Sequence, residues 1–369
     1  MDENLNFSCL QIFDFADFEG YFMKKSVFAL AASLFSAALF AYNPPAGGQS
    51  IFNISSPTQL TSASSAAGGG IFYPGPDSIA FNPALPSFEE RVQLDADFSV
   101  LANKGEGGSG AAFQTGILIP MKMFNFSGLL NGVFLGADDM ELENSLNVKA
   151  GFSKEITERL SVGLNFDSGY LWGNGSDWSL GVGLGALYRR ESLGALKDFR
   201  VGASLLNLGK YYNAKKITGI DESSNSTVFP SFVTLKTGVG ANFLQNDSVV
   251  LGGSFDITTQ CFQNVVFDLG LQLGIKNLVF INLAERIDVS ECAYGSPDLL
   301  PAVGISVKFN LNAKNNSYLA AHNWEKSEML ASAAWQQKYE NIEVVSAGLR
   351  IKLGQKDVEP PVIKIWDEE

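Results

Sequence analysis

The chain is poor in the residues on which most enzyme and metal sites depend. Its 369 residues include a single histidine, His322, and three cysteines. A barrel hydrolase relies on a histidine as general base, and His322 stands beside Asn323 and Trp324 without a serine or aspartate motif. Histidine, cysteine and carboxylate residues do not cluster at a spacing suited to a metal ion. We therefore predict no catalytic residue, no metal site and no cofactor.

Positive charge and long apolar runs are also scarce. The chain has 26 basic and 39 acidic residues, a formal net charge of −13. Nucleic acid is excluded as a partner, because its phosphates need a basic protein face. Three cysteines in 369 residues exclude a scaffold built on disulfides.

One short apolar run near the start is typical of export. Met23-Lys24-Lys25 precede sixteen uncharged residues, Ser26 to Ala41, before the polar break that opens with Tyr42. A basic start, a short apolar core and a small residue before a polar break characterise a secretory signal peptide. A membrane-spanning helix needs about twenty apolar residues. We predict a signal peptide over residues 23–41 and a mature end near Tyr42. Residues 1–22 carry five acids and no Lys or Arg, so we interpret them as a mis-called start.

What the chain has in abundance is alternation of apolar and polar residues. In Val345 to Leu353 the odd-numbered residues are apolar and the even-numbered ones are Ser, Gly, Arg and Lys. Because successive strand side chains point to opposite sides, one face is apolar and the other polar. Similar runs recur along the chain and often last ten residues or more. A soluble β-sandwich also alternates, but its strands usually have about five or six residues. The long runs favour a transmembrane β-barrel with lipid outside and water inside.

The runs predict fourteen antiparallel strands. Because this number is even, the chain enters and leaves the barrel on the same side of the membrane. They cover Arg91–Leu101, Gly110–Ile119, Phe126–Gly136, Ser145–Ser153, Leu160–Leu171, Trp178–Arg189, Phe199–Leu208, Ser231–Ala241, Ser248–Ile257, Val265–Gly274, Leu278–Arg286, Leu300–Leu311, Glu328–Gln337 and Ile342–Leu353. The pattern of Glu328–Gln337 also suits a helix, and Ser317–Trp324 is a competing strand.

The connections alternate in length, as they do in barrels with short periplasmic turns and longer outer loops. Glu155–Arg159, Asn242–Asp247 and Ile275–Asn277 are short, whereas Gly209–Pro230 and Ile287–Leu299 are long and polar. Asn312–Ser327 is too long for its periplasmic position, which is either a real exception or a sign of wrong pairing.

Two further patterns concern single residue types. Cys261 and Cys292 fall in adjacent outer loops, where an oxidising compartment permits a disulfide. The glycines Gly181, Gly183 and Gly185 faintly resemble a nucleotide loop, but their period of two places them on one face of a strand. We interpret them as relief of crowding inside the barrel wall.

Two motifs connect the chain with a known superfamily. Residues 66–84 form a run rich in glycine and proline that ends in Asn82-Pro83-Ala84, with Asp77 and Ser78 upstream. This run resembles the N-terminal hatch of the FadL-like outer-membrane transporters. Residues 201–209 are similar to a strand end of FadL-like and PorV-like barrels. The layout also resembles uncharacterised spirochaetal (treponemal) members of that superfamily.

The combined prediction is an all-β fold, a transmembrane antiparallel β-barrel of about 14 strands with an N-terminal hatch or plug in the lumen. The expected segments are residues 23–41 as signal peptide, 42–90 as hatch, 91–353 as barrel and 354–369 as an acidic periplasmic tail. Proline at positions 74, 76, 83 and 86 keeps the hatch out of the sheet. The alternative for this segment is a disordered periplasmic leader.

Three functions remain open. The resemblance implies a channel in the cell outer membrane for long-chain fatty acids or other hydrophobic molecules. The alternatives are a PorV-like docking barrel for exported proteins and a general porin or structural surface antigen. The expected partners are hydrophobic small molecules, outer-membrane lipid and the barrel-assembly machinery. The segment from Ser346 to Leu353 resembles the C-terminal signal that this machinery recognises. The expected ligand-binding residues are the apolar side chains that point inward and the hatch motif: Ile71, Phe72, Tyr73, Phe81, Asn82, Pro83, Leu187 and Leu206.

Overall fold

The computed structural model describes most of the chain after its N-terminal region. The described residues are 53–61, 65–103, 109–135, 144–173, 176–210, 212, 233–260, 264–289, 292, 300–312, 318–319, 322, 324, 326–338 and 342–354. The predicted mis-called start, signal peptide and acidic tail beyond residue 354 lie outside them, as does Cys261. The expected disulfide with the exposed Cys292 therefore stays a prediction.

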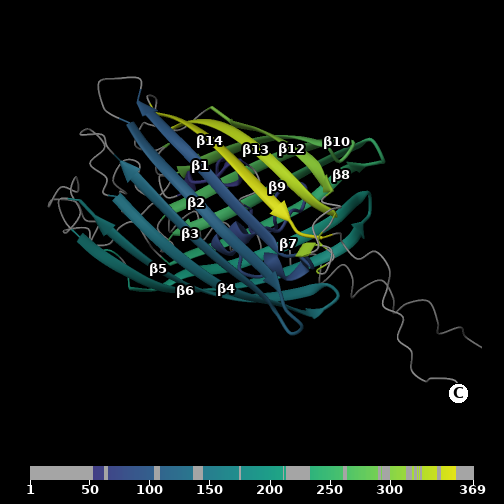
Figure 1. The fold of residues 1–369 in the computed structure, drawn as a ribbon, viewed down its shortest axis with the longest axis horizontal. Helices are drawn as coiled ribbons and strands as arrows, with labels where there is room; N and C mark the ends of the chain where they lie inside the picture. Colours follow the sequence, from purple (N-terminus) through teal and green to yellow (C-terminus); the bar gives the residue numbers. More distant parts are fainter. Residues whose placement is uncertain are drawn as a thin grey trace, which may run out of the picture.

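Fourteen antiparallel strands form a closed barrel in which β1 pairs with both β2 and β14. Figure 1 shows these first and last strands side by side. The strands are β1 Gln93–Asn103, β2 Ser109–Pro120, β3 Asn125–Leu135, β4 Asn144–Thr157, β5 Leu160–Trp172, β6 Ser176–Leu193, β7 Leu196–Lys210, β8 Thr234–Gln245, β9 Val249–Gln260, β10 Asn264–Ile275, β11 Val279–Asp288, β12 Ala302–Asn312, β13 Lys326–Lys338 and β14 Ile342–Lys352.

The predicted strand count is confirmed, and each predicted strand overlaps an observed one. The ambiguous segment Glu328–Gln337 lies within β13, which pairs with both β12 and β14. In the competing segment, the described Tyr318 and Leu319 are helical. The long connection after β12 is thus a real exception at the end where the other turns are short.

The two faces of the barrel wall differ as the alternation predicts. Large apolar side chains point outward, and Phe98, Leu180 and Val345 are each more than half exposed. Polar side chains of the same strands point inward, where the Ser99 hydroxyl donates to that of Ser346 over 2.8 Å. An apolar outer face around a closed ladder suits hydrocarbon, because no strand edge is left without hydrogen bonds. The protein is an outer-membrane type of transmembrane barrel. Among the described residues, no helix is long and apolar enough to cross a membrane.

The two ends of the barrel differ in their connections. Turns of two to four residues follow β2, β4, β6, β8 and β10 at the end where β1 begins and β14 finishes. We call this the short-turn end; the prediction places it in the periplasm. The longest connection, residues 211–233 between β7 and β8, lies at the opposite, long-loop end.

The segment before β1 fills much of the lumen and forms a plug (residues 53–90). It contains the short helix α2 Pro57–Leu60 and the 3₁₀ helices η3 Pro76–Ala80 and η4 Leu85–Phe88. Figure 1 shows these purple helices enclosed between the front and back walls of the barrel. Proline is the first residue of α2 and η3 and the second of η4, because its fixed φ suits the first turn of a helix.

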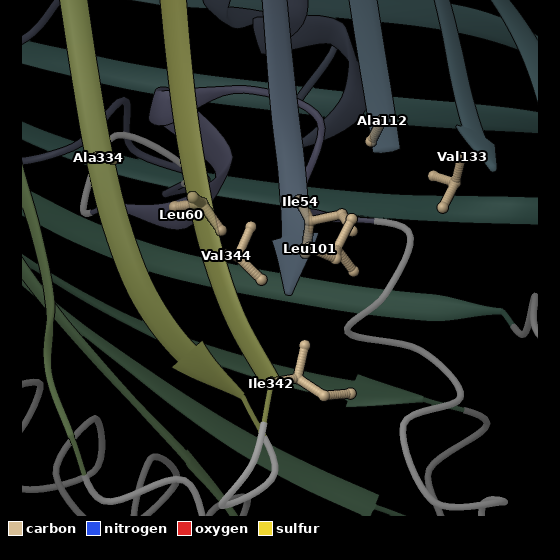
Figure 2. Packing of buried hydrophobic residues seen from close by; sticks show 8 residues of the cluster. All are labelled: Ile54, Leu60, Leu101, Ala112, Val133, Ala334, Ile342 and Val344. Carbon is tan, nitrogen blue, oxygen red and sulfur yellow. The ribbon is translucent and has the colours of Figure 1, made fainter. Parts of the chain in front are cut away.

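An apolar cluster holds the first part of the plug against the wall. Ile54 and Leu60 contact inward side chains of β1 and β14, including Leu101 and Val344, which are fully buried (Figure 2). Inward apolar residues depart from the alternation, because here the inner wall faces protein instead of water. Burial of a Leu or Ile side chain contributes about 1.5–3 kcal/mol, so the cluster fixes the start of the plug.

Candidate functional site in the barrel lumen

Inward-facing glycines give the plug backbone its path along the wall. A Cβ on Gly163 would lie 2.1 Å from the carbonyl oxygen of Pro83, and one on Gly202 would lie 1.9 Å from that of Ala66. No real Cβ approaches so closely, and the obstacle in both cases is backbone. The period-two glycines of β6 also lie where space is short: a Cβ on Gly185 would meet the Asn82 side chain of the plug, and one on Gly181 or Gly183 would meet Asp167 or Asn165 of β5. Their interpretation as relief of crowding is confirmed.

Asn82 connects two parts of the plug with the wall. Its amide nitrogen donates to the carbonyl oxygens of Ala66 over 2.8 Å and of Ala186 on β6 over 2.9 Å. Its amide oxygen accepts from the backbone N–H of Ala84 over 3.0 Å. Asn82 is fully buried, so a side chain that could not make these bonds would leave several polar groups without partners. The geometry gives Asn82 a structural role in holding the plug.

Arg200 on β7 fixes the glycine-rich part of the plug. Its guanidinium donates to the carbonyl oxygens of Ala67, Gly69 and Gly70 over 2.7 to 3.2 Å. The side chain is fully buried, and Asp198 lies 3.7 Å away. A planar guanidinium with several donors suits carbonyl groups that point to one centre.

Two ion pairs connect the plug with the last strand. Arg350 on β14 contacts Asp77 of η3 over 2.7 Å, and Lys352 contacts Glu89 over 3.0 Å. Burial acts to raise the pKa of Glu89, but Lys352 and Arg91 outweigh it and hold that pKa below its usual value. The carboxylate of Glu89 is therefore ionised under ordinary conditions.

A cavity of about 190 Å³, which we call the outer cavity, lies between the plug and the long-loop end. Its apolar lining, which we call its floor, consists of Ala80 and Phe81 of the plug, Leu129 of β3 and Leu206 of β7. Its walls are polar, with amides such as Asn147 and with Tyr212, whose hydroxyl contacts Asn147 over 3.3 Å. Burial raises the pKa of Tyr212 to about 12, so this hydroxyl keeps its proton. An apolar floor under polar walls suits a small molecule with an apolar body and a polar group.

The structure divides the predicted ligand-binding residues among three places. Phe81 and Leu206 line the outer cavity. Phe72 and Tyr73 line a second cavity on the other side of the plug. Leu187 packs against Ala84 and Leu85 between plug and wall, where Phe72 also contacts the cluster. The remaining predicted residues are Ile71, whose N–H donates to Gln272, and Asn82 and Pro83, which contact the wall. They do not form one pocket.

The sequence interpretation missed most polar residues of the outer cavity. These include Asn131, Asn147, Lys149, Gln260 and Arg286. Their signal was available, because each occupies the inward parity of its strand. Among the described residues, no group of three or more His, Cys, Asp or Glu side chains is placed to hold a metal ion.

The sequence matches no family model and no curated protein. The fold, in contrast, is similar to solved structures. The monoaromatic hydrocarbon channel CymD superposes with a TM-score of 0.53 at 11% identity, covering 84% of this chain and all of that one. The chain shares this channel's fold. The toluene transporter TbuX of Ralstonia pickettii gives 0.50 at 12% identity, with 83% and 100% covered. The toluene transporter TodX of P. putida gives 0.50 at 11% identity, with 81% and 98% covered. All three are described as transporters or channels.

Proposed function

We propose that the protein is an outer-membrane channel for hydrophobic and amphipathic small molecules, with long-chain fatty acids as one expected class. The observation that carries this proposal is the outer cavity, whose apolar floor lies directly on the plug. A molecule in the cavity rests on Phe81 and Leu206 and reaches amides and charged groups above them. Movement of the plug residues beneath it would open the way to the short-turn end.

The shared fold supports this proposal, because the similar structures are described as toluene transporters and a monoaromatic hydrocarbon channel. The plug supports it against a general porin, whose lumen is an open aqueous channel. We retain the PorV-like docking barrel as the alternative, since a folded plug and a closed wall also suit a protein with no transport role.

Uptake in cells tests the proposal. We expect expression of the full chain in a strain without such a channel to increase uptake of labelled oleate or toluene, but not of labelled glucose. Leu206→Asn should lower this uptake, because it introduces an amide into the apolar floor. Val201→Ala, on the lipid face of the same strand, should leave it unchanged. Equal uptake with and without the protein would favour the docking barrel.

A further inference from the structure

A second cavity, of about 290 Å³, lies between the plug and the short-turn end. We call it the lower cavity. It is lined by residues from the plug and from β6, β11, β12, β13 and β14. Its volume is close to the lower end of the range of about 300–1,000 Å³ for small-molecule sites. Its charged lining consists of four cations and two carboxylates: Arg91, Arg189, Lys308, Lys352, Glu89 and Glu328.

The two carboxylates of the lining do not neutralise the charge of its four cations. Arg91 contacts both Glu89 and Glu328, over 3.1 and 2.8 Å, and Lys352 shares Glu89. Lys308 reaches Glu328 only over 4.0 Å, the limit of an ion pair.

Arg189 contacts a carboxylate outside the lining, Asp198 of β7, at 2.8 Å, and Asp198 also lies 3.7 Å from Arg200. Even when Asp198 is counted in full against Arg189, one positive charge of the lining remains in excess. Partly buried positive charge attracts a mobile anion, because the low-dielectric walls screen it weakly.

Half of the remaining lining is aromatic, and the other residues are Pro74, Asn277, Met329 and Leu330. Phe72 and Phe88 meet edge to face with their centroids 6.1 Å apart, and Tyr73 meets Phe280 in the same way at 5.3 Å. The Arg189 guanidinium lies over both Phe72 and Phe88, at 5.2 and 5.3 Å from the ring centroids. Burial, followed by repulsion from Glu328, raises the pKa of Tyr73, so its hydroxyl remains a donor. Aromatic rings beside cations can bind the two ends of one amphipathic molecule.

We propose that the lower cavity binds a small amphipathic anion, with one carboxylate or similar head near Lys308 and an aromatic or short alkyl body between the phenylalanine and tyrosine rings. The site lies across the plug from the outer cavity. It is defined by its own lining, and binding there does not require that the protein transports anything. A neutral hydrocarbon lacks the head group, and an inorganic anion lacks the body.

Binding to the purified full chain in neutral lipid nanodiscs tests the proposal, with 2-naphthoate as the probe in calorimetry. We expect 2-naphthoate to bind at least tenfold more tightly than uncharged 2-naphthamide, and phosphate not to displace it. Equal affinities for naphthoate and naphthamide, or displacement by phosphate at similar concentration, would overturn the proposal.

Two variants with opposite effects locate the site. Lys308→Gln should weaken naphthoate binding up to about fivefold, which corresponds to a partly exposed ion pair. Glu328→Gln should tighten it, because a carboxylate is removed from the same cavity; a misfolded protein would not gain affinity. Lys149→Gln, in the outer cavity, is the matched control and should leave the affinity unchanged. If Lys149→Gln has the larger effect, naphthoate binds in the outer cavity and the proposal is wrong, whatever the result of the uptake experiment.

Discussion

At the scale of single residues, the plug depends on positions where any side chain would be too large. The backbone of Pro83 passes Gly163 so closely that the wall tolerates no Cβ there. Hydrogen bonds from Asn82 to β6 and from Arg200 to Ala67 also hold the plug to the wall. The plug is therefore held by the fit of backbone to backbone as well as by its side chains.

We expect Gly163→Ala to displace the plug while the barrel still forms. The added methyl would lie 2.1 Å from the Pro83 oxygen, whereas the strand ladder on both sides is unaffected. Higher conductance in planar bilayers, with normal heat-modifiable mobility on gels, would show this. Gly128→Ala is the control, since its nearest contact would be an ordinary 3.4 Å. Unchanged conductance of Gly163→Ala would mean that the plug shifts without opening a path.

Leu269→Arg should strongly reduce the yield of assembled barrel. Leu269 points outward from β10 and is 43% exposed to what we assign as lipid. Arginine near the bilayer midplane costs about 2–4 kcal/mol on this face. Asn147→Arg, which points into the outer cavity, should assemble normally. Equal yields of heat-modifiable barrel from both variants would contradict the assignment of inside and outside.

The Glu89 ion pairs predict a pH dependence. The pKa of Glu89 in the folded protein is lowered from its ordinary 4.5, so its pairing stabilises the plug above that value. This contribution is lost as the pH falls through the lowered pKa. We expect low, constant conductance from pH 7 down to 5 and a rise below about pH 4.5. Glu89→Gln should already show raised conductance at pH 7 and no further rise. The same acid response in this variant would implicate another carboxylate.

At the scale of the elements, the strands could be predicted because each strand shows an alternation of apolar and polar residues within its own sequence. A period of two along ten residues is local, and the Val345 to Leu353 segment shows it without reference to any other part of the chain. The segment of β13 was ambiguous because Met329, Leu330, Ala333 and Ala334 are spaced for either a helix or a strand. Pairing with β12 and β14 decides in favour of the strand.

The contacts of the plug could not be predicted in the same way. Glycine and proline indicated a segment outside the sheet, but Asp77 and Arg350 are separated by 273 residues. Which inward side chain meets which plug residue depends on the path of the plug, and no local pattern contains that path. The inward Leu101 and Val344 contradict the alternation for the same reason, because they meet Ile54 and Leu60 instead of water.

At the scale of the whole molecule, the barrel and the plug are stabilised by different interactions. The barrel closes through backbone hydrogen bonds between all neighbouring strands, and these do not involve the plug. The plug, in contrast, depends on its contacts with the inner wall, in addition to bonds within the plug such as that from Asn82 to Ala66. Removal of the plug should therefore change permeability more than it changes assembly.

Deletion of residues 68–84 tests this separation. We expect the variant to reach the membrane as a heat-modifiable barrel, and small polar solutes to pass through its opened lumen in planar bilayers. Arg200 would lose Gly69 and Gly70 but keep Ala67, and Arg350 would lose Asp77; both side chains would gain access to water, which limits the cost. A deletion variant with unaltered conductance and unaltered oleate uptake would favour the docking or structural role.

The ion pairs between the plug and β14 also bear on the order of assembly. Asp77 and Glu89 belong to the part of the chain that is made before β1, and Arg350 and Lys352 to its final strand. The same β14 closes the barrel by pairing with β1 along eleven residues. The two carboxylates therefore obtain these partners only when β14 pairs with β1. The step that closes the wall therefore also attaches the plug to it, so each completed barrel has a blocked lumen from the moment it forms.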